Sequence, residues 1–178
     1  VVMTRATAAG AAIINDVEAL QGKDAMKAAA ASGAPVVMMH MKGSPGTMQQ
    51  GPVYDFAPVE IYEFLKQRVA AAIAAGIPAS SIAIDPGFGF GKTVTHNLQV
   101  VNWLSLFHGL GVVVLFGASR KSSIARISAG EPVEARLPGS LALAAAAWRQ
   151  SAQIIRVHDV AETAQALAVE AALLATNS

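Results

Sequence analysis

Polar side chains that can bind a heterocyclic ring or an anion follow five apolar runs of the sequence, at the point where each run ends. Along the chain these residues are Asn15-Asp16, Met39-His40, Asp85, Ser119-Arg120-Lys121, and Arg156 with His158. A carboxylate accepts paired hydrogen bonds, an amide both donates and accepts them, and Lys and Arg side chains attract anions. The sequence therefore predicts a binding site assembled from the ends of several elements.

The stretch from Asp85 to Thr93 reads DPGFGFGKT and ends like a phosphate-binding loop. Such a loop has four residues between its first glycine and the Gly-Lys-Thr. Here Gly87 and Gly91 have three residues between them. The position that would satisfy the spacing is Pro86, which has no N–H to offer a phosphate. We therefore prefer another role for Asp85 and the Gly/Phe loop that follows it.

The apolar runs are rich in Val and Ile and do not alternate cleanly with polar residues, which is typical of strands buried on both faces of a parallel sheet. They span Ala11–Asn15, Pro35–Met41, Ser81–Asp85, Gly111–Gly117 and Ala152–Val157. Ala-rich segments predict helices over Asp24–Ser32, Pro58–Ala75, Asn97–Gly109, Ser140–Gln150 and Val160–Thr176. Asp159 with Glu162 has the pattern of a capping box at the start of the last helix.

Alternating strands and helices predict an α/β protein. Polar residues at successive strand ends favour a (β/α)8 TIM barrel, which builds its site from several strand ends, whereas a doubly wound sheet uses one switch point. Five strands cannot close a barrel of eight, which usually takes about 250 residues. We therefore expect residues 1–178 to be a single domain, a partial (β/α)8 barrel truncated before its first predicted strand.

The composition argues against several classes of protein. With 53% hydrophobic and 14% charged residues, the 178-residue chain can bury a large core. A net charge of +1 makes nucleic acid an unexpected partner. The absence of cysteine excludes disulfides and thiolate metal sites and fits a cytosolic protein. The longest apolar run, Leu141–Trp148, is far shorter than the roughly 18 residues of a membrane span, so no membrane partner is expected.

Six motifs, in order along the chain, resemble the dihydropteroate synthase family of pterin-binding (β/α)8 enzymes. They are Ile13–Val17, Val36–Gln49, Asp85–Thr93, Gly117–Ser122, Arg136–Ala142 and Ile154–Thr163. The resemblance implies that the chain holds the fourth to the eighth strand of the barrel. It departs from the family at Ser151, where a glycine is usual.

The family joins 6-hydroxymethyl-7,8-dihydropterin diphosphate to p-aminobenzoate, which releases pyrophosphate and forms 7,8-dihydropteroate in folate synthesis. In the implied mechanism pyrophosphate leaves first, and the amine attacks a resonance-stabilised pterin cation. The resemblance also implies Mg²⁺, whose protein ligand is an Asn in the part of the family absent from this chain, so no metal ligand is expected here. A homodimer is implied as well.

The resemblance assigns catalytic roles to Asp85, Lys121 and Arg156. Asp85 would accept hydrogen bonds from the pterin 2-amino group and ring N–H, and its charge would favour a cationic intermediate. Its alternative role is to cap the turn that follows. Lys121 would reach the pterin carbonyl and a ring nitrogen. Asn15 suits a heterocycle edge, with an Asx turn as its alternative.

Arg156 and His158 lie two residues apart and therefore face the same side of the last strand. The pair resembles the family's pyrophosphate site, with an ion pair between Arg156 and Asp159 as the alternative. Gly117 permits close approach of the backbone to a ligand. Ser122 stands near a helix start that favours the aminobenzoate carboxylate, and it can also be an ordinary helix cap.

Met39 and Phe90 offer apolar contact to flat rings, although Met39 can equally belong to the core. Arg120 either adds to the field that attracts anions or is a solvated side chain. The irregular stretch Lys42–Ala57 is expected to be a functional loop. Structural roles are expected for Asp16, His40, Met41 and Arg136.

Two rival functions remain. One is a pterin-dependent methyltransferase of the same family, which the SRKS and RVHDV motifs disfavour because no pyrophosphate leaves in that reaction. The other is a non-catalytic pterin-binding fragment, or one half of a split enzyme, which the missing strands favour. Pterin binding without turnover would distinguish this second rival from a synthase.

Overall fold

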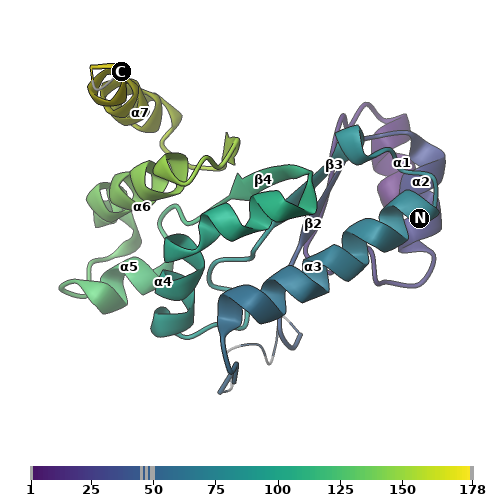
Figure 1. The fold of residues 1–178 in the computed structure, drawn as a ribbon, viewed down its shortest axis with the longest axis horizontal. Helices are drawn as coiled ribbons and strands as arrows, with labels where there is room; N and C mark the ends of the chain where they lie inside the picture. Colours follow the sequence, from purple (N-terminus) through teal and green to yellow (C-terminus); the bar gives the residue numbers. More distant parts are fainter. Residues whose placement is uncertain (1, 45, 47, 49–50, 177–178) are drawn as a thin grey trace.

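The structure is a computed structural model that describes residues 2–44, 46, 48 and 51–176 (Figure 1). Within these residues five parallel strands pair in chain order to form one sheet. The strands are β1 (Ile14–Asp16), β2 (Val36–Met39), β3 (Ile82–Asp85), β4 (Val113–Phe116) and β5 (Ile154–Ile155). The predicted α/β class is confirmed, and the arrangement is that of a partial (β/α)8 barrel.

Helices precede, connect and follow the strands. The α-helices are α1 (Val2–Ala8), α2 (Ala25–Ser32), α3 (Ala57–Ala74), α4 (Val94–Asn102), α5 (Ser122–Ile127), α6 (Leu137–Arg149) and α7 (Val160–Ala175). Short 3-10 turns are η1 (Ala79–Ser81), η2 (Leu104–Leu110) and η3 (Val133–Ala135). None of the helices in the described part of the chain has the length and apolar character that a membrane crossing requires.

The two faces of the sheet differ in how much they bury. Residues paired across a parallel sheet point to the same side, and side chains alternate along each strand. Met38, Ile84 and Val114 are in register and belong to a large apolar core that also contains Leu65 of α3. The opposite face holds a small separate cluster of Val37, Ala83 and Leu115. The helix side therefore supplies most of the core.

The small-cluster face also carries the predicted site. Asn15 pairs with Val37, Met39 with Asp85, and Leu115 with Ile154, so alternation places all of them on this face. This face becomes more exposed toward the edge strands, where Ile13 is 56% and Ile154 40% exposed. Since side chains alternate, Arg156 follows Ile154 on the same side.

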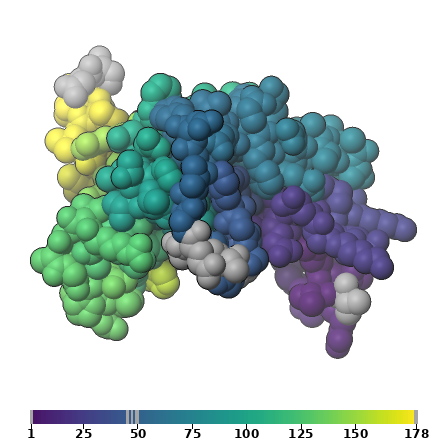
Figure 2. Space-filling model, turned by 90° about the horizontal axis from the view of Figure 1, so that it is seen from below, coloured from purple at the N-terminus to yellow at the C-terminus, as the bar shows by residue number. Residues whose placement is uncertain are grey.

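The sheet is open within the described residues, because β1 pairs only with β2 and β5 only with β4. The two edges lie far apart. The N-terminal elements α1 and α2 (purple) stand at one end of the molecule and α7 (yellow) at the other (Figures 1 and 2). Within the described part of the chain, the sheet therefore has two uncovered strand edges.

Two helix predictions were wrong in their bounds. The helix expected over 140–150 begins three residues earlier, as α6 at Leu137. The helix expected over 97–109 begins earlier, as α4 at Val94, and continues from Leu104 only as the 3-10 turn η2. The early start has a local cause. The Thr93 side chain accepts the His96 backbone N–H at 3.2 Å, and the His96 ring accepts the Thr93 N–H at 3.3 Å. This reciprocal cap fixes the first turn.

The capping box predicted for the last helix was also wrong. α7 begins after Asp159, but the Asp159 side chain makes no cap hydrogen bond to it. The carboxylate instead binds Arg120, 39 residues earlier in the chain. Because a long-range cation competes for the same oxygens, the local motif does not form.

The loop after β2 is partly described, since Pro45, Thr47, Gln49 and Gln50 lie outside the described residues. Lys42 ties the described part to α3. Its Nζ donates to the Val53 carbonyl, lies 3.3 Å from Glu60 Oε2 and stands 4.0 Å from the centre of the Tyr54 ring. These contacts hold Lys42 and the segment around Val53 and Tyr54 against the start of α3.

Candidate active site

Three charged residues at neighbouring strand ends interact with one another. Asp85 ends β3, Lys121 follows β4, and Arg156 follows β5. Asp85 is only 7% exposed, and this burial raises the pKa of its carboxyl group. The positive charges of Lys121, Lys92 and Arg156 oppose that rise. The structure thus brings the three predicted catalytic residues into one electrostatic group.

Asp85 also makes the local contact that we considered as its alternative role. The Gly87 N–H donates to Asp85 Oδ1 at 2.7 Å, which caps the turn after β3. A carboxylate has two oxygens with about four lone-pair sites, so one such bond leaves acceptor capacity for a ligand. Capping the turn and binding a ligand are therefore compatible.

Lys121 lies across the Gly/Phe loop. Its Nζ donates to the Phe88 carbonyl and stands 4.7 Å from the centre of the Phe90 ring. Burial lowers the pKa of Lys121 to about 8, with repulsion from Arg156 in the same direction and attraction to Asp85 against it. The ammonium group remains mostly charged at pH 7, and Phe90 forms an aromatic surface beside it.

The Gly/Phe loop passes directly over the backbone that leaves β2. A Cβ atom at Gly87 would stand 1.9 Å from the His40 carbonyl oxygen, and one at Gly91 would stand 2.2 Å from that of Lys42. Both glycines also have positive φ, of 72° and 62°. Glycine is needed at these positions for close backbone packing, not for binding a phosphate.

Lys92 is the lysine of the DPGFGFGKT stretch that resembles a phosphate-binding loop, and its side chain points into the protein. It is 1% exposed, and its Nζ lies 2.8 Å from the Gly87 carbonyl, 3.0 Å from that of Phe90 and 3.0 Å from His40 Nδ1. Burial lowers the pKa of Lys92 to about 7 and that of His40 to about 2. His40 is therefore a neutral acceptor with a structural role, and Lys92 cannot reach an external phosphate.

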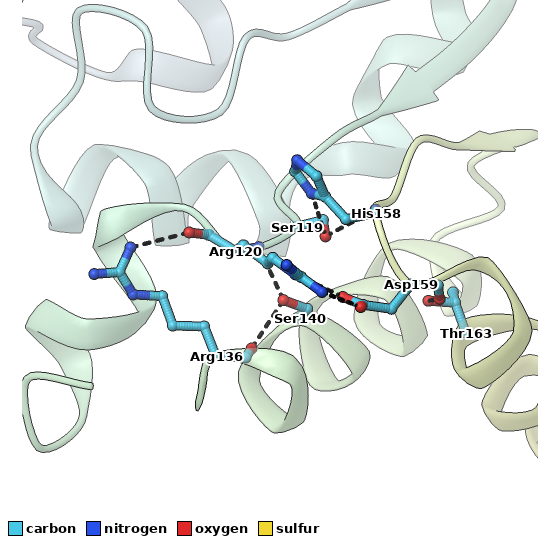
Figure 3. A network of polar contacts seen from close by, with 7 residues as sticks. All are labelled: Ser119, Arg120, Arg136, Ser140, His158, Asp159 and Thr163. Atoms are coloured by element: carbon cyan, nitrogen blue, oxygen red, sulfur yellow. Dashed lines mark hydrogen bonds and ion pairs between the residues drawn. The ribbon is translucent and has the colours of Figure 1, made fainter. Parts of the chain in front are cut away.

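A cavity of about 320 Å³ opens between the ends of β4 and β5. It is lined by Gly117, Ser119, Arg120, Lys121, Val133, Arg156, Val157 and His158. Ser119 Oγ accepts the His158 backbone N–H at 3.2 Å and lies 2.9 Å from His158 Nδ1 (Figure 3). A hydrogen from Ser119 to Nδ1 would place the ring proton on Nε2, which would then be a donor.

The structure does not show the solvated role considered for Arg120, while its contribution to the field that attracts anions stays a prediction. The Arg120 Nε lies 3.0 Å from Asp159 Oδ2, and its NH2 bonds to Oδ1 (Figure 3). These hydrogen bonds hold the pKa of the Asp159 carboxyl below its usual range. The pairing considered for Arg156 with Asp159 is thus made by Arg120 instead. Arg136, as expected, is a helix-entry contact, and it donates to the Arg120 carbonyl at 3.0 Å.

The other predicted residues are more scattered. Asn15 is exposed on the edge strand β1, and Met39 is buried at the end of β2 against the Gly/Phe loop. Ser122 is the exposed first residue of α5, and the residue at the cap position is Lys121. Asp16 caps a turn, as expected, by accepting the Leu20 N–H at 2.6 Å.

Sequence reasoning missed Asn97, which joins two parts of the site. Asn97 is 1% exposed, accepts the Gly89 N–H at 2.7 Å and donates to Ser123 Oγ at 3.1 Å. It thereby fixes the Gly/Phe loop to the start of α5. An Asn within a predicted helix gives no sign of such contacts, so the sequence offered no usable signal.

The described residues do not fit a metal held by side chains of this chain. Among them, no group of three or more His, Cys, Asp or Glu residues gathers where a metal ion could bind. The charged residues of the cavity are mostly cations, which repel Mg²⁺.

The chain is similar in sequence to a family of pterin-binding enzymes and to individual dihydropteroate synthases. Residues 1–158 match the family described as pterin binding enzyme. Dihydropteroate synthase of Escherichia coli K12 is 46% identical over 165 residues, which are 93% of this chain and 58% of that protein. This chain therefore spans just under three fifths of that relative's length.

Solved structures agree with the sequence relatives. Dihydropteroate synthase from Stenotrophomonas maltophilia, with imidazole in its active site, is 45% identical at a TM-score of 0.95, over 98% of this chain and 66% of that one. The Xanthomonas albilineans enzyme was solved with 4-aminobenzoic acid and with 7,8-dihydropteroate. These two structures are 45% and 44% identical, each at a TM-score of 0.91, over 98% of this chain and 62% and 63% of theirs.

Proposed function

Because this chain belongs to the pterin-binding enzyme family, we propose that its strand-end site serves the dihydropteroate synthase reaction. That reaction joins 6-hydroxymethyl-7,8-dihydropterin diphosphate to p-aminobenzoate and releases pyrophosphate. The observation that carries the proposal is the electrostatic group of Asp85, Lys121 and Arg156 at neighbouring strand ends. The aminobenzoic acid and dihydropteroate held by the Xanthomonas albilineans enzyme support it.

In this proposal the pterin lies over the end of β3. The Asp85 carboxylate accepts hydrogen bonds from the 2-amino group and the adjacent ring N–H. Lys121 donates to the pterin carbonyl and a ring nitrogen, in place of its bond to Phe88. Phe90 and Met39 contact the flat ring, and Asn15 contacts its edge from β1.

The reaction then proceeds in two steps. The C–O bond to pyrophosphate breaks, its electron pair leaves with the oxygen, and the pterin carries a delocalised positive charge. The amine nitrogen of p-aminobenzoate forms the new C–N bond with its lone pair and releases one proton. The negative charge of Asp85 favours the cation electrostatically, since the group is preorganised in a site shielded from water.

The cavity between β4 and β5 receives the anions. Arg156 stacks its planar guanidinium on the pterin and directs its N–H groups to phosphate oxygens, while His158 contributes a second donor. The p-aminobenzoate carboxylate lies near Gly117 and Ser122. A methyltransferase has no leaving pyrophosphate, so this cation-lined cavity favours the synthase reaction over that rival.

Calorimetry on the 178-residue chain tests the pterin anchor. Asp85→Asn should weaken the binding of 6-hydroxymethyl-7,8-dihydropterin diphosphate by about 1.5–3 kcal/mol, the usual scale for a hydrogen bond to a charged group. That is roughly tenfold or more in affinity. Glu63→Gln, which makes the same chemical change at an exposed position of α3, is the control and should bind as the wild type does. Unchanged binding by the Asp85 variant would reject the assignment.

A second candidate is pterin binding without turnover, as a fragment or as one half of a split enzyme. The open sheet favours it, because Asn15 and Arg156 lie next to uncovered edges. Catalysis by positioned groups falls steeply when part of the constellation is absent. Tight pterin binding with no release of pyrophosphate, in an assay supplied with p-aminobenzoate, would select this candidate.

A further inference from the structure

The loops after β4 and β5 are joined by two adjacent sets of polar contacts (Figure 3). The first is the forked bond of Arg120 to both carboxylate oxygens of Asp159. The second is Ser119 Oγ, which contacts both the backbone N–H and the Nδ1 of His158. Two consecutive residues on one side therefore bind two consecutive residues on the other.

The backbone at Arg120 is held in an unusual conformation. Its φ is 56°, in the left-handed region, which residues other than glycine adopt only at a cost. Contacts with the start of α6 hold it there. The Arg120 N–H donates to Ser140 Oγ at 2.9 Å, Ser140 donates to the Arg136 carbonyl at 2.8 Å, and Arg136 donates to the Arg120 carbonyl.

This conformation sends two neighbouring cations to different places. The Arg120 side chain reaches Asp159, while the Lys121 side chain lies over the Gly/Phe loop. Lys121 is one of the proposed catalytic residues, and His158, next to Asp159, is a proposed anion donor. The contacts of Arg120 and Ser119 thus connect the segments that carry these two groups.

We propose that Arg120 and Asp159 are positioning residues, whose ion pair acts with the Ser119–His158 contact as a strap between the two loops. The strap fixes the spacing between Lys121 on one side of the cavity and Arg156 with His158 on the other. This inference rests on the proposed function, in which the cavity receives pyrophosphate.

The rival role for Arg120 is direct binding of the anion. The hydrogen bonds and charges around it argue against that role. Arg120 bonds to both carboxylate oxygens of Asp159, and the negative charges of Glu134 in η3 and Glu162 in α7 act on it as well. Two N–H groups of Arg120 already donate to the Asp159 carboxylate. Arg120 therefore has fewer donors available for a phosphate than Arg156 has.

Calorimetry of pyrophosphate binding to the 178-residue chain distinguishes the two roles, because they predict opposite changes in affinity for the variant Asp159→Asn. If Arg120 binds the anion, Asp159→Asn frees its guanidinium, removes a negative charge and tightens binding. If the pair is a strap, the same change weakens binding, by about three- to fivefold for an ion pair of this exposure. Unchanged or tighter binding would overturn the strap. Asp159 makes no side-chain cap bond to α7, so the change does not uncap that helix.

Glu170→Gln is the matched control. Glu170 forms the same forked contact with Arg149, at 2.8 and 2.7 Å, but joins α6 to α7 and is not among the residues that line the cavity. It should leave pyrophosphate binding unchanged. Arg156→Gln should weaken it strongly, and if it does not, the proposed anion site is wrong independently of the strap.

Amide hydrogen exchange of the ligand-free chain tests the strap even if pyrophosphate does not bind. Asp159→Asn should speed exchange at Lys121 and His158 by about threefold or more, because local opening becomes easier. Glu170→Gln should not change those rates. Arg120→Lys, which keeps the charge but loses the fork, should resemble Asp159→Asn. Equal rates in Asp159→Asn and wild type would refute the strap directly.

Discussion

Lys92 carries an amine into the interior, where burial disfavours the charged form. Three acceptors surround its Nζ, two of them carbonyls of the Gly/Phe loop and the third the ring of His40. The same cation acts on Asp85 and opposes the rise in its pKa. Lys92 therefore stabilises the site in two ways. It holds the Gly/Phe loop through hydrogen bonds, and its positive charge favours the ionised form of Asp85.

The pH dependence of stability should reveal this buried amine. The pKa of Lys92 falls from 10.5 to about 7 on folding, so between these values the unfolded chain binds more protons than the folded one. Stability attributable to this group should thus rise with pH across that window, by up to about 1.4 kcal/mol per pH unit. We expect the difference in urea-unfolding free energy between wild type and Lys92→Met to grow from pH 7 to pH 9.

Lys66→Met controls for loss of a lysine, because Lys66 is exposed and pairs only with Glu63 among the ion pairs identified in the described residues. Its difference from wild type should stay small and constant with pH. A constant difference for Lys92→Met as well would mean that Lys92 is not a neutralised buried amine.

Sequence reasoning at this scale placed Asp85, Lys121 and Arg156 at strand ends, and the structure brings the three together, while their catalytic roles stay predictions. Sequence reasoning failed where the role depends on a distant partner. The ion pair of Arg120 with Asp159 spans 39 residues, and nothing local to either residue indicates it.

At the scale of elements, the strands were the more predictable part. Runs of Val and Ile buried on both faces need no partner to be recognised, and β2 to β5 all lie within the predicted runs. Helix bounds were less predictable, and at α4 a side-chain cap decides where the helix begins. The reciprocal bonds of Thr93 and His96 moved the start of α4, and they cannot be read from apolar spacing.

The end of α6 carries a testable strain. Ser151 follows this helix with φ of 64°, in the left-handed region that favours glycine, and the resemblance implies a glycine at this position. A residue with a Cβ atom pays about 1–2 kcal/mol to adopt this conformation, and glycine avoids that cost. Glycine also makes the unfolded chain more flexible, which destabilises the folded state and offsets part of the gain. Ser151→Gly should therefore stabilise the chain by about 0.5–1 kcal/mol in urea unfolding. Ser151→Ala keeps the Cβ atom and should bring no such gain, and a gain of equal size would exclude backbone strain as the cause.

At the scale of the whole molecule, the open sheet dominates the expected behaviour in solution. β1 and β5 each present one side without a strand partner among the described residues, and Ile13 and Ile154 are exposed beside them. Uncovered strand edges with apolar side chains promote pairing between chains.

We therefore expect the purified 178-residue chain to associate as its concentration rises, as measured by sedimentation velocity. Ile154→Lys places a charge at the edge and should reduce association. Val59→Lys, on the outer helix α3, removes a similarly exposed apolar side chain away from both edges and should not. A monomer at all concentrations, or an equal effect of both variants, would show that the strand edges do not drive association.

The unequal faces of the sheet have a consequence for protein engineering. The outer layer, on the helix side, belongs to the large core and includes Met38, Ile84 and Val114. The inner layer is thin, with Val37, Ala83 and Leu115 as its buried members. A designer could exchange these three residues to resize the interior while the outer layer keeps the strand ends in place. The same fold could then enclose a smaller or larger interior and bind ligands of different size, with the proposed catalytic groups unchanged.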